Sequence, residues 1–482
     1  MMYTFSRQVL PSISRNYVKS VAYYGSGVQS ALSHLKDISV TSEEVDSYKE
    51  AVKIYNPAYT YEHPSFVAFP RCVEDVKRCL QIADNTTTPV AVRSGGHSFA
   101  GYSTIDSKGF VISLEKMNTV TLEDDKVTVE AGANWGDVYS ALDNTGYVAV
   151  GGCVPAVGIG GYILGGGYSM LSRAYGGLAC DKALSFTMVT SDGKEVVKAS
   201  AQENDDLFWA LRGGGGGNFG VMTDVTLQVC PSPREFVWTR LTYSSTHSSE
   251  QGLIAVGNNL ANFPRELNLD IALHGFSGEK VLTLGGVYSD HHEDKVQAAF
   301  GNLHPTETSP PKKYTSFLKF TTDYSKRHGF VHNEVEPIYV KGAMINSLPV
   351  QLAKYFAELK IPPECLIEFV HMGGDIQLTP PTATAFVARS AQYSFYTYGR
   401  FQDPRHKAEV LKFATSTYEA VKSSGCTVGS YVNYMDQDLK NWANEYYGEN
   451  YERLCKIKEK WNPTASGSLH FQQEIGSKWE PS

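Results

Sequence analysis

Three glycine-rich segments constrain this 482-residue chain more than any other feature. They are residues 93–98 (RSGGHS), residues 151–168 (GGCVPAVGIGGYILGGGY) and residues 212–221 (RGGGGGNFGV). Glycine lets backbone approach other groups closely and exposes amides that can hold a phosphate. The second segment contains too much glycine for a helix and too few polar residues for a surface linker. We therefore predict a chain that wraps tightly around a large bound cofactor, with His97 and Cys153 within reach of it.

The chain is longer than one ordinary domain, so we expect more than one domain, and its composition is that of a folded globular protein. Its 43 basic and 51 acidic residues are mixed along the chain, so no basic stripe predicts binding to nucleic acid. Its eight cysteines are scattered and form no Cys-x-x-Cys pair, which argues against a disulfide framework. Residues 144–172 carry no charge, but their glycines would leave backbone groups unsatisfied in lipid, so we expect no membrane span.

Residues 1–44 are predicted to form an N-terminal extension. This segment has no sustained apolar core of the kind a secretory signal needs. It is rich in serine, has four basic residues before Asp37 and no acidic residue there, a pattern that organelle leaders share. A simple extension before the fold is the other interpretation, so the sequence leaves localisation open.

Helices and strands alternate along the first half of the chain. We expect helices over residues 73–84, 134–144 and 205–211, and strands over 89–93, 109–114, 126–130 and 221–229. Pro231 and Pro233 mark a boundary, after which strands such as 281–288 and 392–398 alternate with helices such as 403–423. The pattern predicts an α+β fold with a nucleotide-binding lobe followed by a sheet that helices cover on one side.

Four motifs occur in a fixed order: residues 93–98, residues 157–167 (VGIGGYILGGG), residues 212–220 and residues 431–434 (YVNY). Together they resemble the berberine bridge enzyme family of FAD-linked oxidases, which has the vanillyl-alcohol oxidase / p-cresol methylhydroxylase fold. The resemblance implies a two-lobed protein of the PCMH type. Its expected parts are an FAD-binding domain (45–232), a substrate-binding domain built on an antiparallel sheet (233–424) and a C-terminal segment that completes the FAD lobe (425–482).

The resemblance also implies how FAD is held. His97 would be tethered to the 8α-methyl group of the flavin ring, and backbone amides near it would hold the pyrophosphate. Val157 would control the access of oxygen to the flavin. The full set of expected cofactor-binding residues is His97, Arg93, Ser94, Gly95, Gly96, Ser98, Val157, Gly158, Gly161, Tyr162, Gly165, Gly166, Gly167, Asn218, Phe219, Gly220, Val221 and Asn433.

Cys153 is the candidate for a second covalent link to the flavin. Family members with two links carry Cys-Pro-Thr-Val-Gly, whereas Cys153 stands four residues before Val157 and Val154 occupies the expected position. A one-residue offset in an extended segment turns a side chain to the opposite face. We therefore expect one link, through His97, although a local bulge would restore the second.

Oxidation of a substrate C–H or C–N bond also needs a group that accepts a proton. Some family members have an acidic or basic side chain where Ser394 stands, so we do not expect a carboxylate base there. A tyrosine with a lowered pKa is the alternative. The candidate catalytic residues are Tyr434, Tyr431 and Tyr396, with Tyr434 first because family members use its motif position.

His328 and His332 have a spacing that could suit a metal ion. Gly329 stands between them where a zinc protease would carry its glutamate, and glycine weakens the helix that the spacing requires. We therefore predict no metal.

The sequence predicts an FAD-dependent oxidase that transfers a hydride from a small organic molecule to covalent flavin and reduces oxygen to hydrogen peroxide. The tyrosine-rich strand over residues 392–398 favours an aromatic or polycyclic secondary metabolite. The alternatives are a sugar or oligosaccharide oxidase, a dehydrogenase or oxidative cyclase on the same scaffold, and a flavin-carrying binding protein without turnover. The expected partners are the substrate and oxygen, and we expect a monomer or a weak homodimer.

Overall fold

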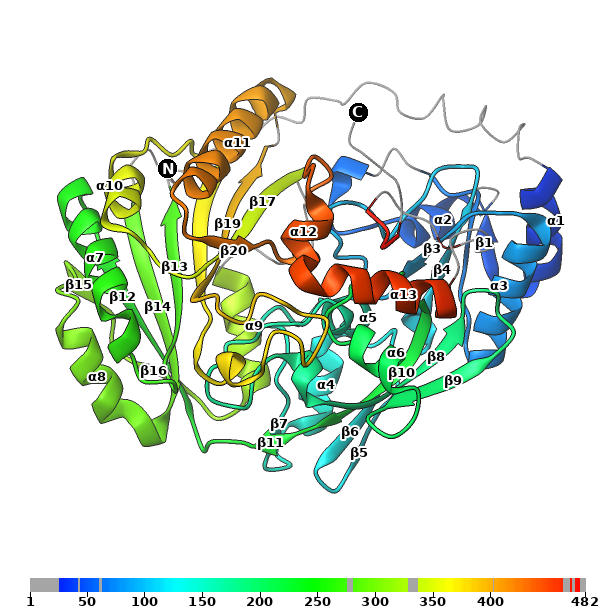
Figure 1. Ribbon diagram of the computed structural model, residues 1–482, viewed down its shortest axis with the longest axis horizontal. Coiled ribbons are helices and arrows are strands. Elements are labelled where there is room, and N and C mark those ends of the chain that lie inside the picture. The colour runs from blue at the N-terminus through cyan, green and yellow to red at the C-terminus, as the bar shows by residue number, and fades with distance from the viewer. Residues whose placement is uncertain are drawn as a thin grey trace, which may run out of the picture.

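The chain folds into two lobes, each with its own hydrophobic core (Figure 1). A computed structural model describes residues 26–41, 44–59, 63–274, 281–327, 337–401, 403–462, 469 and 473–476. The first lobe carries two sheets and the second carries one large sheet. Among the described residues, no helix is both long enough and apolar enough to cross a membrane.

A four-stranded mixed sheet begins the first lobe. Its order is β1-β2-β4-β3, with β1 antiparallel to β2, and with β2 and β3 each parallel to β4. The strands are β1 (Ser39–Thr41), β2 (Phe66–Ala68), β3 (Val90–Arg93) and β4 (Phe110–Ser113). The helices of this part are α1 (Ser26–Leu35), α2 (Val45–Ala51) and α3 (Val73–Thr86). Helix α3 buries the face formed by Val76, Cys79, Leu80 and Ala83, as its helical spacing dictates.

The second sheet of this lobe has five antiparallel strands in the order β5-β6-β10-β8-β9. They are β5 (Val120–Glu123), β6 (Lys126–Glu130), β8 (Ala183–Thr190), β9 (Val196–Ser200) and β10 (Gly220–Gln228), and a separate pair joins β7 (Tyr147–Val148) to β11 (Cys230–Pro231). The helices are α4 (Trp135–Leu142), α5 (Ile159–Leu164) and α6 (Asp205–Ala210). Asn134 and Asp137 form a capping box that begins α4.

The second lobe is a nine-stranded antiparallel sheet with helices on its outer face (Figure 1). Its strands are β12 (Phe236–Tyr243), β13 (Asn268–His274), β14 (Val281–Ser289), β15 (Glu307–Thr308), β16 (Lys312–Tyr314), β17 (Ile338–Ile345), β18 (Cys365–His371), β19 (Tyr393–Arg400) and β20 (Thr427–Gly429). Helices α7 (Thr246–Asn259), α8 (Glu293–Gly301), α10 (Val350–Glu358) and α11 (Lys407–Ser423) cover the outer face. Helix α9 (Phe317–Arg327) instead contributes aromatic side chains to the core of the first lobe.

The C-terminal segment connects the two lobes. Strand β20 pairs with β17 at the edge of the large sheet. Helices α12 (Trp442–Tyr447) and α13 (Tyr451–Trp461) lie against the first lobe (Figure 1). There the Tyr447 hydroxyl donates to the Gly214 carbonyl oxygen at 3.0 Å, and Lys460 pairs with Asp206 at 2.7 Å.

The predicted α+β fold with two lobes is confirmed, and the expected helices and strands form within a few residues of their predicted bounds. Two expectations were wrong. The described residues of the predicted extension belong to the first lobe, because α1 packs on α3 and β1 pairs with β2. Residues 159–164 form helix α5 despite their glycines, because Ile159, Ile163 and Leu164 are buried in the core and stabilise it.

Candidate functional site

A cavity of about 330 Å³ lies between the two lobes. One wall consists of backbone from the three glycine-rich segments. The opposite wall consists of side chains from β18 and β19 and from residues 431–435. The predicted site residues that line it are Ser94, Gly95, Gly96, His97, Ser98, Cys153, Val157, Gly158, Gly161, Tyr162, Gly220, Val221, Tyr396, Tyr431, Asn433 and Tyr434.

The first two glycine-rich segments cross at Gly95 and Gly158. A Cβ added to Gly158 would lie 2.1 Å from the Gly95 nitrogen, so only glycine allows this approach. The Ser94 hydroxyl fixes the crossing, since it donates to the Ala131 carbonyl oxygen at 2.6 Å and accepts from the Gly160 amide at 3.2 Å. The crossing brings His97 and Val157 to the same wall of the cavity.

Gly161 and Gly216 give the glycine wall an open surface. Neither would bring an added Cβ within 3.4 Å of another group, and both line the cavity. Other glycines of the third segment are packed closely: a Cβ on Gly213 would lie 2.3 Å from the Phe386 nitrogen. Close backbone packing therefore supports a bare backbone surface, which is the kind of surface a dinucleotide needs.

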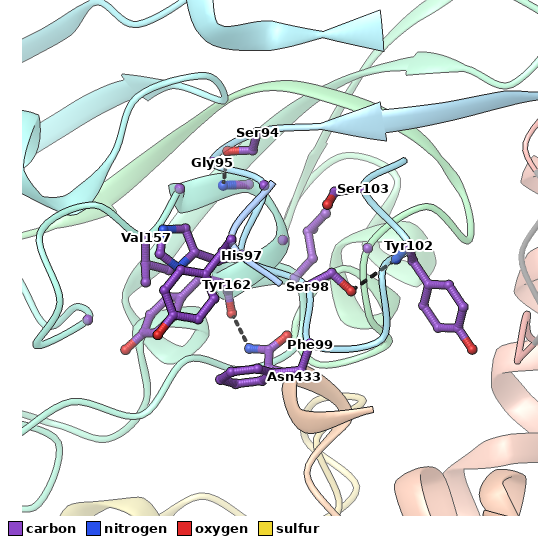
Figure 2. Close-up of a pocket in the computed structure, with 18 of the residues that line it drawn as sticks. Ser94, Gly95, His97, Ser98, Phe99, Tyr102, Ser103, Val157, Tyr162 and Asn433 are labelled. Carbon is purple, nitrogen blue, oxygen red and sulfur yellow. Dashed lines mark hydrogen bonds between the residues drawn. The ribbon is translucent and has the colours of Figure 1, made fainter. Parts of the chain in front are cut away.

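His97, Val157 and Tyr162 lie together on this wall (Figure 2). The His97 ring stacks on the Tyr55 ring, with centroids 4.4 Å apart and planes 19° apart. The Asn433 side-chain amide donates to the Tyr162 carbonyl oxygen at 2.8 Å (Figure 2), which joins the C-terminal motif to α5. Stacking on the Tyr55 ring therefore holds the His97 side chain in place at the cavity wall.

Several residues predicted to bind the cofactor lie outside the cavity lining. The Arg93 guanidinium is buried and donates to the Ala51 carbonyl oxygen at 2.6 Å. The Asn218 side chain accepts from the Ile475 amide at 3.0 Å, and Phe219 is a core residue. Gly165, Gly166 and Gly167 pack behind the wall, where a Cβ on Gly165 would meet Asn433. These residues support the site structurally, because their polar groups are used within the protein.

Cys153 lines the cavity, whereas its one-residue offset from the family motif predicted a side chain on the opposite face. Residues 153–157 form a turn rather than an extended segment, and the Val157 amide donates to the Val154 carbonyl oxygen at 3.1 Å. The extra residue is accommodated in that turn, so the thiol stays on the cavity side. Burial raises the pKa of the Cys153 thiol, and the nearby Asp270 carboxyl group raises it further.

The three candidate catalytic tyrosines all line the cavity but differ in their contacts. The Tyr431 hydroxyl accepts from the Gly167 amide at 3.0 Å and from the Asn433 side chain at 2.9 Å. The hydroxyl groups of Tyr434 and Tyr168 hydrogen-bond to each other. The predicted lowered pKa was wrong: burial raises the pKa of Tyr396, Tyr431 and Tyr434.

The structure adds a carboxyl group that the sequence interpretation missed. Glu368 on β18 lines the cavity and lies opposite Tyr396 on β19. Burial and the neighbouring Asp270 carboxyl group raise the pKa of Glu368, while a hydrogen bond from Tyr396 opposes that shift. A signal was present in the sequence, since Glu368 is the charged residue inside the apolar strand Cys365–His371.

Within the described part of the chain, no cluster of three or more His, Cys, Asp or Glu side chains could hold a metal ion. His328 and His332 lie outside the described residues.

Comparisons with known proteins agree with this site. The FAD binding domain family matches residues 64–199, and the berberine and berberine-like family matches residues 430–466. YvdP of Bacillus subtilis, named an uncharacterized FAD-linked oxidoreductase, is 30% identical over 89% of this chain and 95% of its own length. A carbohydrate oxidase of Microdochium nivale is also 30% identical, over 86% of this chain and 89% of its own length.

A solved structure of berberine bridge enzyme from Eschscholzia californica superposes with a TM-score of 0.82, covers 92% of this chain and 98% of its own, and is 22% identical. The chain therefore belongs to the berberine bridge enzyme-like family of FAD-linked oxidoreductases. It is an oxidoreductase whose cofactor is FAD. The bare backbone at Gly161 and Gly216 fits that cofactor, and His97 lines the same cavity.

Proposed function

We propose that this protein is an FAD-dependent oxidase that takes a hydride from a small aromatic or polycyclic metabolite and reduces oxygen to hydrogen peroxide. The observation that carries the proposal is the composition of the cavity. Its glycine wall offers backbone to a dinucleotide, and its opposite wall offers tyrosines and one carboxyl group to a substrate. Bound FAD would supply the two-electron acceptor, and the chain's own residues would hold both molecules and move the proton.

His97 would carry FAD through a single covalent link. The stacking of its ring on Tyr55 restricts the ring's orientation, which supports attachment at one position of the flavin. Cys153 lines the same cavity, but the raised pKa of its thiol leaves little thiolate at neutral pH. Thiolate is the form of cysteine that attacks an electrophile, so we propose that the second link does not form.

Tyr434 is our first candidate for the group that handles the substrate proton. Its hydroxyl bonds to that of Tyr168, and its ring lies 5.0 Å from the Tyr396 ring, centroid to centroid. Glu368 is the second candidate, because its carboxyl group borders the same cavity next to Tyr396. Tyr431 is less suited to proton transfer, since its oxygen already accepts two hydrogen bonds from Gly167 and Asn433.

Oxygen is the proposed acceptor because of Val157, which lies on the cavity wall. By the family resemblance, the residue at this position controls the access of oxygen to the flavin, and valine there is associated with oxidases. A dehydrogenase or oxidative cyclase on the same scaffold would use another acceptor. Stopped-flow mixing of the reduced enzyme with air-saturated buffer separates the two: an oxidase reoxidises rapidly, whereas slow reoxidation would exclude oxygen as the main acceptor.

A carbohydrate oxidase is the second candidate function, and the relative from Microdochium nivale favours it. A screen that detects hydrogen peroxide with aromatic alcohols, aromatic amines and oligosaccharides tests both candidates together. We expect peroxide from one of the aromatic classes. Turnover of oligosaccharides alone would favour the carbohydrate oxidase, and a protein that produces no peroxide and no flavin reduction with any class would contradict both.

A further inference from the structure

Asn56, which lies between α2 and β2, uses every hydrogen-bonding position of its side chain. The residue is fully buried, with an exposed fraction of 0%. Its Nδ2 group donates to the carbonyl oxygens of Phe99 at 2.7 Å and Ile338 at 2.9 Å. Its Oδ1 atom accepts from the amides of Ile338 and Ala58, both at 3.1 Å. A side-chain amide has two donor hydrogens and two acceptor lone pairs, so this network fixes the direction in which the Asn56 amide points.

The bonds of Asn56 join two distant parts of the chain. Phe99 follows His97 by two residues, at the end of the first glycine-rich segment. Ile338 is the first residue of β17, in the large sheet of the second lobe. Asn56 binds both the amide and the carbonyl oxygen of Ile338, as a residue of a neighbouring strand would. One side chain therefore connects the backbone beside His97 to the large sheet.

The preceding residue, Tyr55, contacts the other side of His97. The Tyr55 amide donates to the Gly96 carbonyl oxygen at 3.0 Å, and the Tyr55 ring stacks on the His97 ring. The Phe99 ring meets the Tyr55 ring edge-on, with centroids 6.0 Å apart. Residues 55 and 56 thus contact the chain just before His97, its ring, and the chain just after it. Contacts of this kind hold a functional side chain in one orientation.

We propose that Asn56 is a positioning residue for His97, and that it sets the orientation of the His97 ring when the large sheet docks on the first lobe. The proposal rests on the proposed attachment of FAD through His97. Asn56 is not among the described residues that line the cavity, so it acts through the backbone of Phe99 and through its neighbour Tyr55. The bonds to Ile338 form only when the two lobes are docked. The chain therefore presents His97 for attachment once both walls of the cavity are in place.

The test replaces the two donors of this side chain and leaves its shape. Asn56→Asp keeps an acceptor for the Ile338 amide, but it places an oxygen against the carbonyl oxygens of Phe99 and Ile338. Full-length chains purified without flavin from riboflavin-starved cells would be mixed with FAD, and the mass of denatured samples would be followed over time. We expect covalent attachment to Asn56→Asp to be about tenfold slower than to the wild-type chain, the factor that corresponds to one hydrogen bond.

Asn450→Asp is the matched control. Asn450 has an exposed fraction of 3% and lies outside the cavity lining, and its Nδ2 group donates to the carbonyl oxygens of Pro381, Thr384 and Ala385. The chemical change is the same at both positions, so both variants should melt earlier than the wild-type protein, whereas only Asn56→Asp should slow attachment. Attachment to Asn56→Asp at the wild-type rate, or equal slowing in both variants, would overturn the proposal. Asn56→Ala and Asn450→Ala repeat the comparison without a buried carboxyl group, and the same outcomes apply.

Hydrogen–deuterium exchange of the flavin-free chains separates failure of this proposal from failure of the proposed His97 link. A wild-type chain that gains no flavin mass would contradict the link. The positioning role would still predict that residues 97–104 exchange about tenfold faster in Asn56→Asp than in the wild-type chain, because a bond that restrains them is lost, and that Asn450→Asp leaves them unchanged. Wild-type exchange of this segment in Asn56→Asp would overturn the positioning role, whether or not flavin attaches.

Discussion

The crossing of the first two glycine-rich segments makes a sharp prediction about two alanine substitutions. In Gly158→Ala the new Cβ would lie 2.1 Å from the Gly95 nitrogen and 2.4 Å from the Ser94 hydroxyl oxygen. The φ angle of Gly158 is −67°, so the penalty comes from the collision alone and not from backbone strain. Because a backbone atom must move, we expect the upper range for overpacking, about 3 kcal/mol, which corresponds to roughly 6–12 °C in the melting temperature of a lobe of about 150–250 residues that unfolds by itself.

Gly161→Ala is the matched control, three residues along the same segment. No other group lies within 4 Å of its added Cβ, and alanine is favoured over glycine inside α5 by up to about 1 kcal/mol. The methyl group would instead enter the cavity. We therefore expect a lower flavin content per chain, and a melting temperature that is unchanged or higher when flavin-free preparations of the variant and the wild-type protein are compared.

Thermal unfolding by circular dichroism and the ratio of flavin to protein absorbance measure the two effects separately. A Gly158→Ala protein that melts at the wild-type temperature would contradict the predicted collision, and so would a Gly161→Ala protein that melts at a lower temperature than Gly158→Ala.

Three further predictions concern side chains around the site. Asp181→Asn breaks the buried ion pair with Arg389, in which two nitrogen–oxygen distances are 2.6 and 2.7 Å. The free energy of unfolding measured in urea should fall by about 3–5 kcal/mol, and a loss below about 1 kcal/mol would contradict this. Tyr431→Phe removes the acceptor of two hydrogen bonds and should cost about 1–3 kcal/mol of stability. Tyr434→Phe removes one hydrogen bond, to the Tyr168 hydroxyl, so it should lower the melting temperature less than Tyr431→Phe does and should slow flavin reduction in stopped-flow experiments. The reverse pattern would exchange their roles. The pKa of Glu368 is raised in the folded state, so its ionisation destabilises the folded protein as the pH rises. Glu368→Gln should therefore raise the urea midpoint of unfolding at pH 8 more than at pH 4. An equal effect at the two pH values would show that the charge of Glu368 is unimportant for stability.

Much of the glycine wall could be predicted from the sequence because glycine occurs where a larger residue would collide with its neighbours. Where backbone passes within 2.3 Å of the position of a Cβ, as at Gly95, no other residue is tolerated, and the requirement is visible as a cluster of glycines. The helices and strands of the first lobe were predictable for a similar reason, since residues such as Val76 and Leu80 follow the period of a helix face.

The wall formed by β18, β19 and residues 431–435 was predicted less well because it depends on contacts between distant segments. Glu368 and Asp270 are brought together by the pairing of β13 with β18, which no local pattern reveals. The orientation of Cys153 depends on the turn at residues 153–157, whereas the register argument assumed an extended chain. The tyrosine pKa values were predicted in the wrong direction because the depth of burial was not known from the sequence.

The intact mass of the denatured protein and of its His97→Ala variant decides whether His97 is the single covalent link to FAD. We expect that the wild-type chain keeps the mass of one FAD after denaturation and that the His97→Ala chain does not, while Cys153→Ala retains the flavin. A bare wild-type chain, or flavin that stays covalently attached in His97→Ala and is lost only when Cys153 is also replaced, would contradict the assignment of His97 as the single link.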